Sequence, residues 1–375
     1  RLHVWQTFEA PFVEWHGNMW LTEDWKTNAS FGIYDHSLER RFPPPGPSEY
    51  NTPRRRVQGR AISLVGFSPT NYYHWLMGAL PRLVVLFPTL QASPDMKIIV
   101  PRLSPPPPPP SSASSTVNDD FISQTLRMVL PARYPLDKQR VDYNVRDQAP
   151  GLRLRVDTLV WADWTPVQTS AGRGLGPTHC LASPGSLIAT QAHLQSVVRG
   201  GGGMSADGGG SDDSGSRDAA ATAFVLYVGR NGTASRHLEG EWRLLERVRE
   251  VLARASTAHG GRRWELVVFD GGTSGMRGAR KQFDKASVVL AVHGAGLANL
   301  VFCKRHTKVI EIGFRSPAAE HYRHAALAMD MEYKWVPLES DVHAMAKKRV
   351  RLIEDGEATI VELIESAVIP EEGEL

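Results

Sequence analysis

Residues 286–314 constrain the fold of this chain most strongly. Two runs rich in β-branched residues, at 287–292 and 307–312, flank a glycine-containing segment at 293–296 and a short apolar helix that follows it. This order predicts a strand, a tight turn, a helix and a second strand. The turn comes at the carboxyl end of the first strand, where open α/β sheets bind their ligands.

The turn has the sequence His293, Gly294, Ala295, Gly296. We expect both glycines to adopt a positive φ and so to let a ligand approach the backbone closely. The N–H groups at the start of the following helix would then face an anion, because helix N-termini carry a partial positive charge. A phosphate is the ligand that this segment predicts.

Length and composition place the chain among ordinary globular proteins. Its 375 residues allow two domains, and 42% hydrophobic with 22% charged residues is typical of a soluble enzyme. The net charge of +3 suits an anionic small ligand, whereas a nucleic-acid protein would show a concentrated basic stripe. The densest basic cluster, at 54–56, is interpreted as a solvated loop.

Cysteine content and hydropathy exclude several classes of protein. With Cys180 and Cys303 alone, a disulfide framework and a thiolate metal site are both excluded, although one bridge is possible in an oxidising compartment. No apolar run is long enough to cross a membrane. Because the first residue is Arg1, we expect a segment of a longer protein, with room for a signal or anchor upstream. Glycosylation sequons at Asn28 and Asn231 give weak support for a lumenal location.

Low-complexity segments divide the chain. Proline-rich stretches lie at 43–47 and 105–110, and a Gly/Ser/Asp-rich stretch that cannot form a core lies at 200–216. We therefore predict an N-terminal α/β domain, a linker, a C-terminal Rossmann-type domain and a helical tail that packs back on the first domain. The predicted ranges are 1–199, 200–221, 222–345 and 346–375.

Hydrophobic periodicity predicts the elements of each part. In the first part the expected strands are 61–65, 96–100 and 154–161, and the expected helices are 71–87, interrupted at Pro81, and 119–130. In the second part the expected strands are 223–228, 266–269, 287–292, 307–312 and 333–336, and the expected helices are 239–255, 276–285 and 318–329. This alternation predicts a parallel Rossmann-type sheet.

Three groups of residues are candidates for chemistry. His74 lies at the start of a predicted helix, where an imidazole is suited to proton transfer near neutral pH; the alternative is a histidine packed among aromatic residues. Arg230 and Arg236 follow the first strand of the second domain, and their guanidinium groups match phosphate oxygens. The alternative is a pair of surface arginines in a loop.

The third group is the 293–296 turn together with Asn299 and Glu311. Glu311 ends a strand on the same side and is expected to accept hydrogen bonds from ribose hydroxyls. The alternative is an ion pair with a neighbouring arginine. No Asp-x-Asp pair lies beside a predicted strand, so no metal site is predicted.

Four segments resemble glycosyltransferase family 61, which includes plant xylan arabinosyl- and xylosyltransferases and animal O-linked N-acetylglucosaminyltransferases. They are NYYHWLMGALPRL at 71–83, YVGRNGTASR at 227–236, VHGAGLANLVF at 292–302 and KVIEI at 308–312. The resemblance implies a GT-B architecture, with two Rossmann-like domains across a cleft. Two positions depart from the family pattern: residues 236–239 match only partly, and Ala279 stands where a glutamine is expected.

The resemblance also implies an activity. It implies inverting transfer from a nucleotide sugar, usually a UDP-sugar, to a glycan or glycoprotein hydroxyl, without a metal cofactor, in the lumen of the Golgi or endoplasmic reticulum. The full-length protein is expected to be a type II membrane protein whose anchor lies upstream of this chain. Arg230 and Arg236 would hold the diphosphate with the glycine turn, Glu311 would sit near the nucleoside, and His74 would face the cleft. Alternatives are an inactive nucleotide- or sugar-binding module of this fold, and an enzyme like a polysaccharide pyruvyltransferase.

Overall fold

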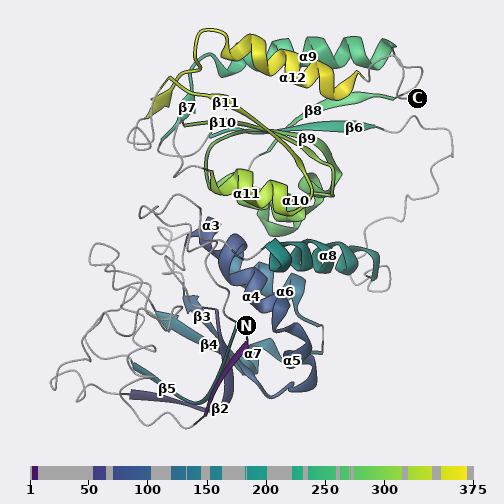
Figure 1. Cartoon of the computed structure of the whole chain (residues 1–375). Helices are drawn as coiled ribbons and strands as arrows, with labels where there is room; N and C mark the ends of the chain where they lie inside the picture. Colours follow the sequence, from purple (N-terminus) through teal and green to yellow (C-terminus); the bar gives the residue numbers. More distant parts are fainter. Residues whose placement is uncertain are drawn as a thin grey trace, which may run out of the picture. The chain divides into compact units, whose positions relative to one another are not determined.

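The chain forms two units (Figure 1). The computed structural model describes residues 2–6, 54–64, 71–102, 120–131, 133–144, 153–162, 182, 184–200, 222–230, 235–258, 262–269, 271, 274–314, 320–339 and 348–369. The N-terminal unit comprises Arg1–Gln168 and His179–Thr190, and the C-terminal unit comprises Thr169–Thr178 and Gln191–Leu375. Most of the predicted linker, 201–221, lies outside the described residues, as do Cys180 and both sequons.

The N-terminal unit contains a five-stranded sheet in the order β1-β5-β2-β3-β4. Its strands are β1 (Leu2–Gln6), β5 (Arg153–Ala162), β2 (Arg54–Ser63), β3 (Lys97–Arg102) and β4 (Arg140–Asn144). All neighbours are parallel except β1, which is antiparallel to β5. The basic cluster 54–56 was interpreted as a loop, and this is wrong, because these residues begin β2 and pair with β5.

The helices of this unit include a break that the sequence only partly predicts. They are α3 (Tyr72–His74), the π-helix η5 (Trp75–Ala79), α4 (Leu80–Val85), α5 (Phe87–Ala92), α6 (Phe121–Val129) and α7 (Leu136–Gln139). Pro81 lies at the start of α4, where a missing N–H is tolerated. The carbonyl four residues earlier, at Met77, instead accepts a hydrogen bond from Ala182 N at 3.1 Å. Helix α8 (Pro184–Gly200) was not predicted and crosses the boundary between the units.

The C-terminal unit is built on a five-stranded parallel sheet in the order β11-β10-β9-β6-β8. Its strands are β6 (Ala223–Val228), β8 (Trp264–Val268), β9 (Ala286–Val292), β10 (Lys308–Gly313) and β11 (Glu332–Pro337). Helices α9 (Glu241–Ala258) and α12 (Gly356–Val368) cover one face, and α10 (Gly275–Lys285), the 3₁₀-helix η7 (Ala295–Phe302) and α11 (His321–Ala328) cover the other (Figure 1). A short parallel pair joins β7 (His237–Leu238) to β12 (Arg349–Val350). The predicted parallel α/β sheet is therefore confirmed.

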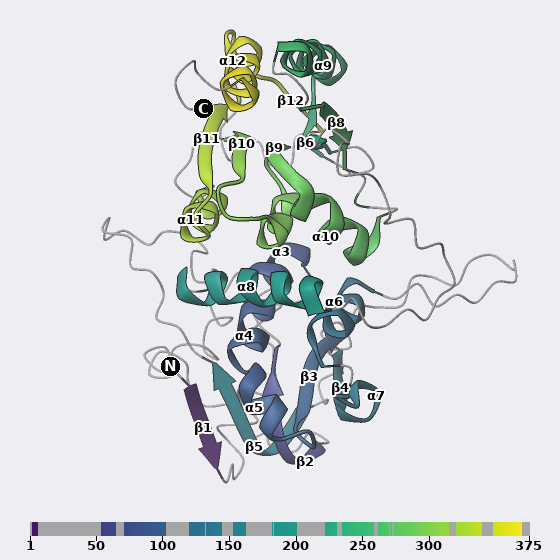
Figure 2. The ribbon, with the colours of Figure 1, turned by 90° about the vertical axis from the view of Figure 1, so that its right-hand side faces the viewer.

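The apolar faces of these elements explain how they pack. Val248 and Leu252 of α9 and Ile360 and Ile364 of α12 are buried in one core with the sheet strands. The two helices lie side by side over the sheet (Figure 2). The expectation that the tail packs on the first domain is wrong, because the apolar stripe of α12 is buried within the C-terminal unit.

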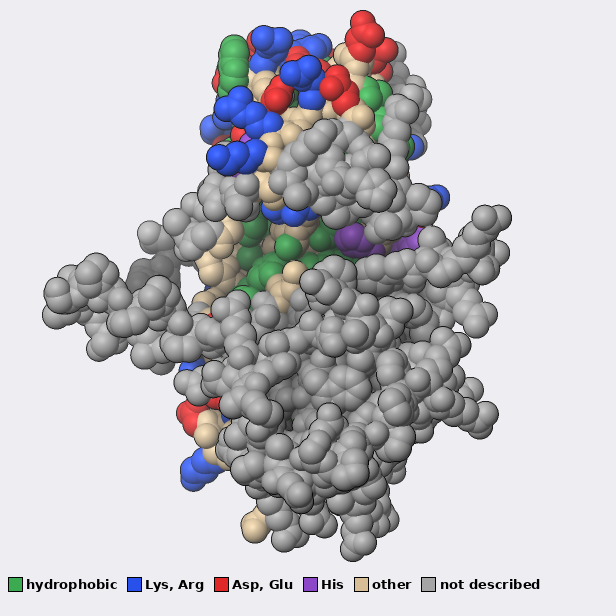
Figure 3. Space-filling view, turned by 90° about the vertical axis from the view of Figure 1, so that its left-hand side faces the viewer, with side chains coloured by type: hydrophobic (Ala, Val, Ile, Leu, Met, Phe, Trp, Pro, Cys, Tyr) green, Lys and Arg blue, Asp and Glu red, His purple; other side chains and the backbone are tan. Residues whose placement is uncertain are grey.

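Ion pairs link the outer surfaces of these two helices. Arg247 pairs with Glu357 at 2.9 Å, and Arg254 pairs with Glu365 at 3.0 Å. Basic and acidic side chains accordingly intermingle over this end of the unit (Figure 3). Exposed pairs of this kind contribute little to stability individually, so the buried core is the main source of attachment for α12.

Candidate functional site

The fold brings the second and third candidate groups to one edge of the C-terminal sheet. Strand β6 ends at Val228 and is followed by Gly229 and Arg230, while β9 ends at Val292 and is followed by His293. Because β6 and β9 are parallel neighbours, both chain segments leave the sheet at its carboxyl edge. Arg230 and His293 therefore lie at the same end of the sheet.

Two glycines of the turn are required by packing against β6 and the residues that follow it. A Cβ built on Gly294 would collide with the guanidinium group of Arg230, and a Cβ on Gly296 would lie 2.8 Å from Val228 Cγ1. The expectation of positive φ angles is wrong: Gly294 is extended, with φ 164° and ψ 177°, and Gly296 lies within η7. Glycine is therefore required at both positions because there is no space for a side chain, and not because the backbone is left-handed.

Close packing also requires a glycine at position 229, directly after β6. A Cβ there would lie 2.8 Å from Glu241 Oε1 and 2.9 Å from Tyr227 Cε1. The buried Tyr227 hydroxyl donates a hydrogen bond to Glu241 Oε1 at 2.5 Å, and burial followed by this carboxylate raises the pKa of Tyr227. This contact anchors the start of α9 and sets the path by which the chain reaches Arg230.

Arg236 lies near Arg230 and has an unusual backbone conformation. Its φ of 66° is left-handed, which is costly for a residue with a Cβ and is found at functional sites more often than elsewhere. Its buried Nε has no hydrogen-bond partner, and the guanidinium forms no ion pair, among the residues that the structure describes. The Arg230 Nε donates to the carbonyl of the adjacent Ser235 at 3.3 Å.

The two arginines lie in a partly desolvated, electropositive environment. Burial, and then the charge of Arg236, lower the pKa of Arg230 to about 10. Burial also lowers the pKa of Arg236. Each charge is therefore destabilised by its surroundings. An anion placed between the two guanidinium groups would relieve both the desolvation and the mutual repulsion.

His293 is held by a buried network. Its Nδ1 lies 2.5 Å from Glu311 Oε1, and the Tyr333 hydroxyl donates to Glu311 Oε2 at 2.6 Å. The side chains of His293 and Glu311 are only 3% and 1% exposed. Glu311 thus bonds to a histidine and a tyrosine, not to an arginine as in the alternative interpretation, and its carboxylate orients His293.

Tyr322 and His321 of α11 complete the cluster and were not among the predicted site residues. The ring centroid of His293 lies 5.4 Å from that of Tyr322 and 5.3 Å from that of His321. Burial, and then Glu311, raise the pKa of Tyr322, while the charges of Arg236 and Arg230 act in the opposite direction. The sequence carried one signal for these residues, because they open the predicted helix that follows the strand ending near Glu311.

The remaining turn residues stabilise η7. The Asn299 side chain is buried, and its Nδ2 donates to the Gly296 carbonyl at 2.9 Å. Leu297 N donates to Gly294 O at 3.0 Å and so closes the first turn. Ala295 and Gly296 are half-buried, whereas Asn299 is inaccessible. Asn299 therefore acts as a brace for the turn, and the backbone at 295–296 is the part that is partly accessible.

His74 belongs to the N-terminal unit, whereas the other eight candidates belong to the C-terminal unit. It ends α3, whose N-cap Asn71 accepts a hydrogen bond from Tyr73 N at 2.9 Å. The π-helix η5 begins directly after it, and π-helical turns are frequent at functional sites. Burial lowers the pKa of His74 to about 4, so the imidazole is neutral at pH 7 and can accept a proton or a hydrogen bond.

The described ranges contain no group of three or more His, Cys, Asp or Glu side chains placed to hold a metal ion. None of the helices in those ranges is sufficiently long and apolar to span a bilayer. Cys303 is a buried free thiol whose pKa is raised by burial and then by Asp284.

These observations define an α/β protein with two neighbouring arginines, one of them packed against a glycine turn, at the carboxyl edge of a parallel sheet. The family described as Glycosyltransferase 61 matches residues 72–310, which is more than half of the chain and includes all the candidate residues except Glu311. The chain therefore belongs to glycosyltransferase family 61, and this membership implies glycosyltransferase activity. A comparison with curated proteins gave no match.

Proposed function

We propose that this protein is an inverting glycosyltransferase that transfers a sugar from a UDP-sugar to a hydroxyl of a glycan or glycoprotein. The observation that carries the proposal is Arg230, which packs against Gly294 at the carboxyl edge of the sheet, together with Arg236, whose charge is close enough to lower the pKa of Arg230. Two desolvated guanidinium groups that repel each other suit a diphosphate, whose oxygens accept forked hydrogen bonds. The partly accessible backbone at 295–296 would add N–H donors to the same anion.

In the proposed reaction the acceptor oxygen attacks the anomeric carbon of the donor sugar. The bond from that carbon to the diphosphate oxygen breaks, the acceptor proton passes to a base, and the nucleoside diphosphate leaves. Arg230 and Arg236 would stabilise the charge that grows on the leaving group, the role that a divalent metal fills in other enzymes. No metal cofactor is required in this scheme.

His74 is the proposed base or positioning group for the acceptor hydroxyl. Its neutral state at pH 7 and its place before a π-helix support the assignment. Because a pKa of about 4 makes a weak base, the alternative within the proposal is that the neutral imidazole accepts a hydrogen bond from the acceptor hydroxyl and so positions it. His74 and the arginines belong to different units, so the proposal includes a GT-B arrangement in which both units contribute to one reaction.

Glu311 has an indirect role in the proposal. The sequence suggested a contact with the nucleoside, but both of its carboxylate oxygens bond to side chains and it is almost fully buried. We assign it to the positioning of His293, which in turn borders the glycine turn. By analogy with the family, we propose that the protein acts in the lumen of the secretory pathway.

Two other functions remain as competitors: an inactive nucleotide- or sugar-binding module, and a pyruvyltransferase-like enzyme. Calorimetry with UDP, UDP-sugars and phosphoenolpyruvate, combined with an assay for UDP release in the presence of acceptor glycans, separates the three. We expect UDP to bind and at least one UDP-sugar to release UDP. UDP binding with no release from any donor would favour the inactive module. Binding of phosphoenolpyruvate without UDP binding would favour the pyruvyltransferase.

A further inference from the structure

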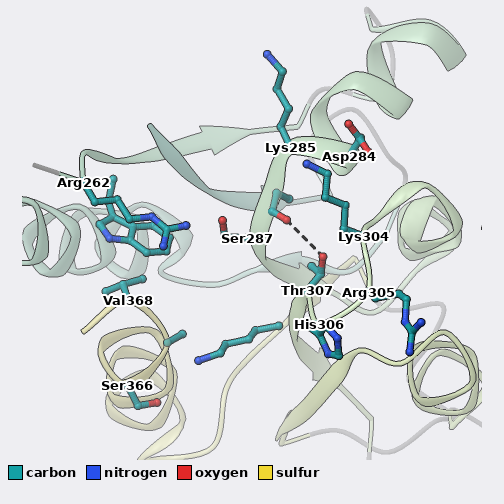
Figure 4. A pocket seen from close by; sticks show the side chains of 14 residues that line it. Arg262, Asp284, Lys285, Ser287, Lys304, Arg305, His306, Thr307, Ser366 and Val368 are labelled. Carbon is teal, nitrogen blue, oxygen red and sulfur yellow. Dashed lines mark hydrogen bonds between the residues drawn. The ribbon is translucent and has the colours of Figure 1, made fainter. Parts of the chain in front are cut away.

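A basic pocket lies at the opposite edge of the C-terminal sheet from the candidate site (Figure 4). Its volume is about 680 Å³, within the range typical of ligand-binding pockets. The first residues of β9 and β10, the last residues of α10 and α12, and the turn 304–307 line it. Arg262 and Val368 lie on one side, Lys304 and His306 on the other, and Ser287 between them (Figure 4).

This pocket is not an extension of the proposed diphosphate site. Ala286 and Ser287 open β9, whereas His293 follows its last residue. A seven-residue strand such as β9 spans roughly 20 Å from end to end. Lys308 likewise opens β10, at the far end from Gly313. A ligand in this pocket would therefore lie remote from the reacting atoms.

The charge of the pocket is strongly positive and largely uncompensated. Arg262, Lys285, Lys304 and Lys308 line it, and none of the four forms an ion pair with another residue that the structure describes. Asp284 is the one acidic residue among the described residues that line it. Lys285 ends α10, where a cation is favoured by the helix dipole, but that effect does not account for the other three.

Arg305 differs from these four residues because its charge is compensated. Its Nε and Nη2 lie 3.0 and 2.7 Å from Asp330 Oδ2, and its side chain points away from the centre of the pocket (Figure 4). The positive charge of the lining therefore comes from the other four residues, of which Arg262 and Lys304 lie on opposite sides of the pocket (Figure 4). Spaced charges of this kind suit a ligand that carries several separated anionic groups.

Neutral groups in the lining add a second recognition element. Ser287 and Ser366 supply hydroxyls, whereas the hydroxyl of the buried Thr307 donates to the Ala286 carbonyl at 3.4 Å. The Arg262 guanidinium lies 4.9 Å from the centroid of the Trp264 ring, which keeps it extended along the wall. Hydroxyls between cationic groups match the alternation of hydroxyls and acidic groups along a charged sugar chain.

We infer that this pocket binds an acidic oligosaccharide, a glycan segment carrying carboxylate or sulfate groups. Ammonium groups are point charges that bind such anions without the forked geometry that a guanidinium offers to phosphate. A recessed pocket favours an oligosaccharide over an anionic membrane, which is recognised by a polybasic segment that reaches a flat surface. The inference rests on the proposed function, because an enzyme that modifies glycans would encounter acidic sugar chains. It adds a binding site outside the reaction centre.

Calorimetry on the whole chain tests the inference with four probes: tetragalacturonate, a heparin-derived tetrasaccharide, neutral maltotetraose, and vesicles containing phosphatidylserine. Binding of either acidic tetrasaccharide, with no binding of maltotetraose, is expected, and the two acidic probes distinguish carboxylate from sulfate. The double variant Lys304→Gln, Lys308→Gln should weaken that binding about fivefold or more. The matched control, Lys138→Gln with Lys348→Gln, removes two exposed charges elsewhere and should leave binding unchanged.

Several outcomes would overturn the inference: binding of maltotetraose as tight as that of the acidic probes, wild-type affinity in the double variant, or binding to vesicles but to neither acidic tetrasaccharide. If the double variant melts at a lower temperature than the wild type, the single variants Lys304→Gln and Lys285→Gln replace it in the binding test, because both residues are exposed. UDP binding measured on the same samples keeps the two proposals apart. If the wild type does not bind UDP, the proposed donor site is refuted but the glycan site is not. If the double variant binds UDP as tightly as the wild type, its loss of glycan binding is caused by the change in the pocket.

Discussion

The guanidinium group of Arg230 occupies the space in which a side chain on Gly294 would begin. The residues come from segments about 60 positions apart, and parallel pairing of β6 with β9 brings them together. Val228 fills the corresponding space at Gly296. The two motifs are therefore complementary parts of one packed structure, and a change in either should affect the other.

Gly294→Ala tests this complementarity. The new Cβ must displace Arg230, so we expect UDP affinity to fall about tenfold, as for loss of a charge-assisted contact. Overpacking should also lower stability by about 1–3 kcal/mol. Calorimetry and thermal melting measure the two effects. Gly185→Ala is the control, because a Cβ there meets nothing within 4 Å. Unchanged UDP affinity in Gly294→Ala would show that the position of Arg230 does not matter for the donor.

Arg236 allows function and backbone strain to be separated. Arg236→Ala and Arg236→Gly both remove the guanidinium group, so each should weaken UDP binding about tenfold or more, as should Arg230→Ala. At φ 66° glycine is favoured over alanine by about 1 kcal/mol, so Arg236→Gly should melt at a higher temperature than Arg236→Ala. Arg249→Ala, on the exposed surface of α9, should leave UDP binding unchanged. Equal UDP affinity in the wild type and both position-236 variants would refute the phosphate assignment.

The buried network around Glu311 predicts an order of stabilities. Glu311→Ala leaves the Nδ1 of His293 and the hydroxyl of Tyr333 without their partner, which should cost about 3–5 kcal/mol. Tyr333→Phe removes one hydrogen bond and should cost about 1 kcal/mol. Denaturant unfolding of both variants measures the two values. Equal losses, or a Glu311→Ala protein as stable as the wild type, would mean that Glu311 does not hold this network together.

Hydrophobic periodicity predicted the C-terminal unit to within a few residues because its strands and helices are long and strongly patterned. It missed β1, β4, α7 and α8 of the N-terminal part, and the short strands β7 and β12 of the C-terminal unit. Helix α8 has a weakly apolar face, with Thr190 and Gln191 buried beside Leu187 and Leu194, so no clear stripe marks it. Gln191 is buried because its side chain donates to the Cys303 carbonyl at 2.9 Å, a contact that only the tertiary fold creates.

The candidate site was predictable in part for a similar reason. Strand ends placed Arg230, His293 and Glu311 on one edge, since parallel strands share their carboxyl ends. The roles of the glycines were predicted wrongly, because a sequence does not distinguish a glycine needed for positive φ from one needed for close packing. Tyr322 was missed because its contact with His293 depends on how α11 packs.

His74→Gln yields a prediction about stability and pH. The folded-state pKa of about 4 lies below the ordinary value of 6.5, so the unfolded chain binds more protons between these values. The wild type should therefore lose stability as the pH falls from 6.5 to 4, by about 2 kcal/mol at pH 5 from this residue. The fall in melting temperature from pH 7 to pH 5 should be smaller in His74→Gln. His306→Asn, at a 74% exposed side chain, should keep the wild-type dependence.

The same His74→Gln variant tests the proposed role in transfer. A base typically contributes about 10²–10⁴-fold to rate, so turnover should fall by that factor. UDP affinity should stay near the wild-type value, because the diphosphate is assigned to Arg230 and Arg236 in the other unit. UDP release from a UDP-sugar with acceptor gives turnover, and calorimetry gives affinity. Transfer at the wild-type rate would refute the base role. If the variant unfolds at pH 7, or loses UDP binding and turnover together, His74 is instead a residue that packs among aromatic side chains. Tyr73 is one such neighbour, with its ring centroid 5.1 Å from that of His74.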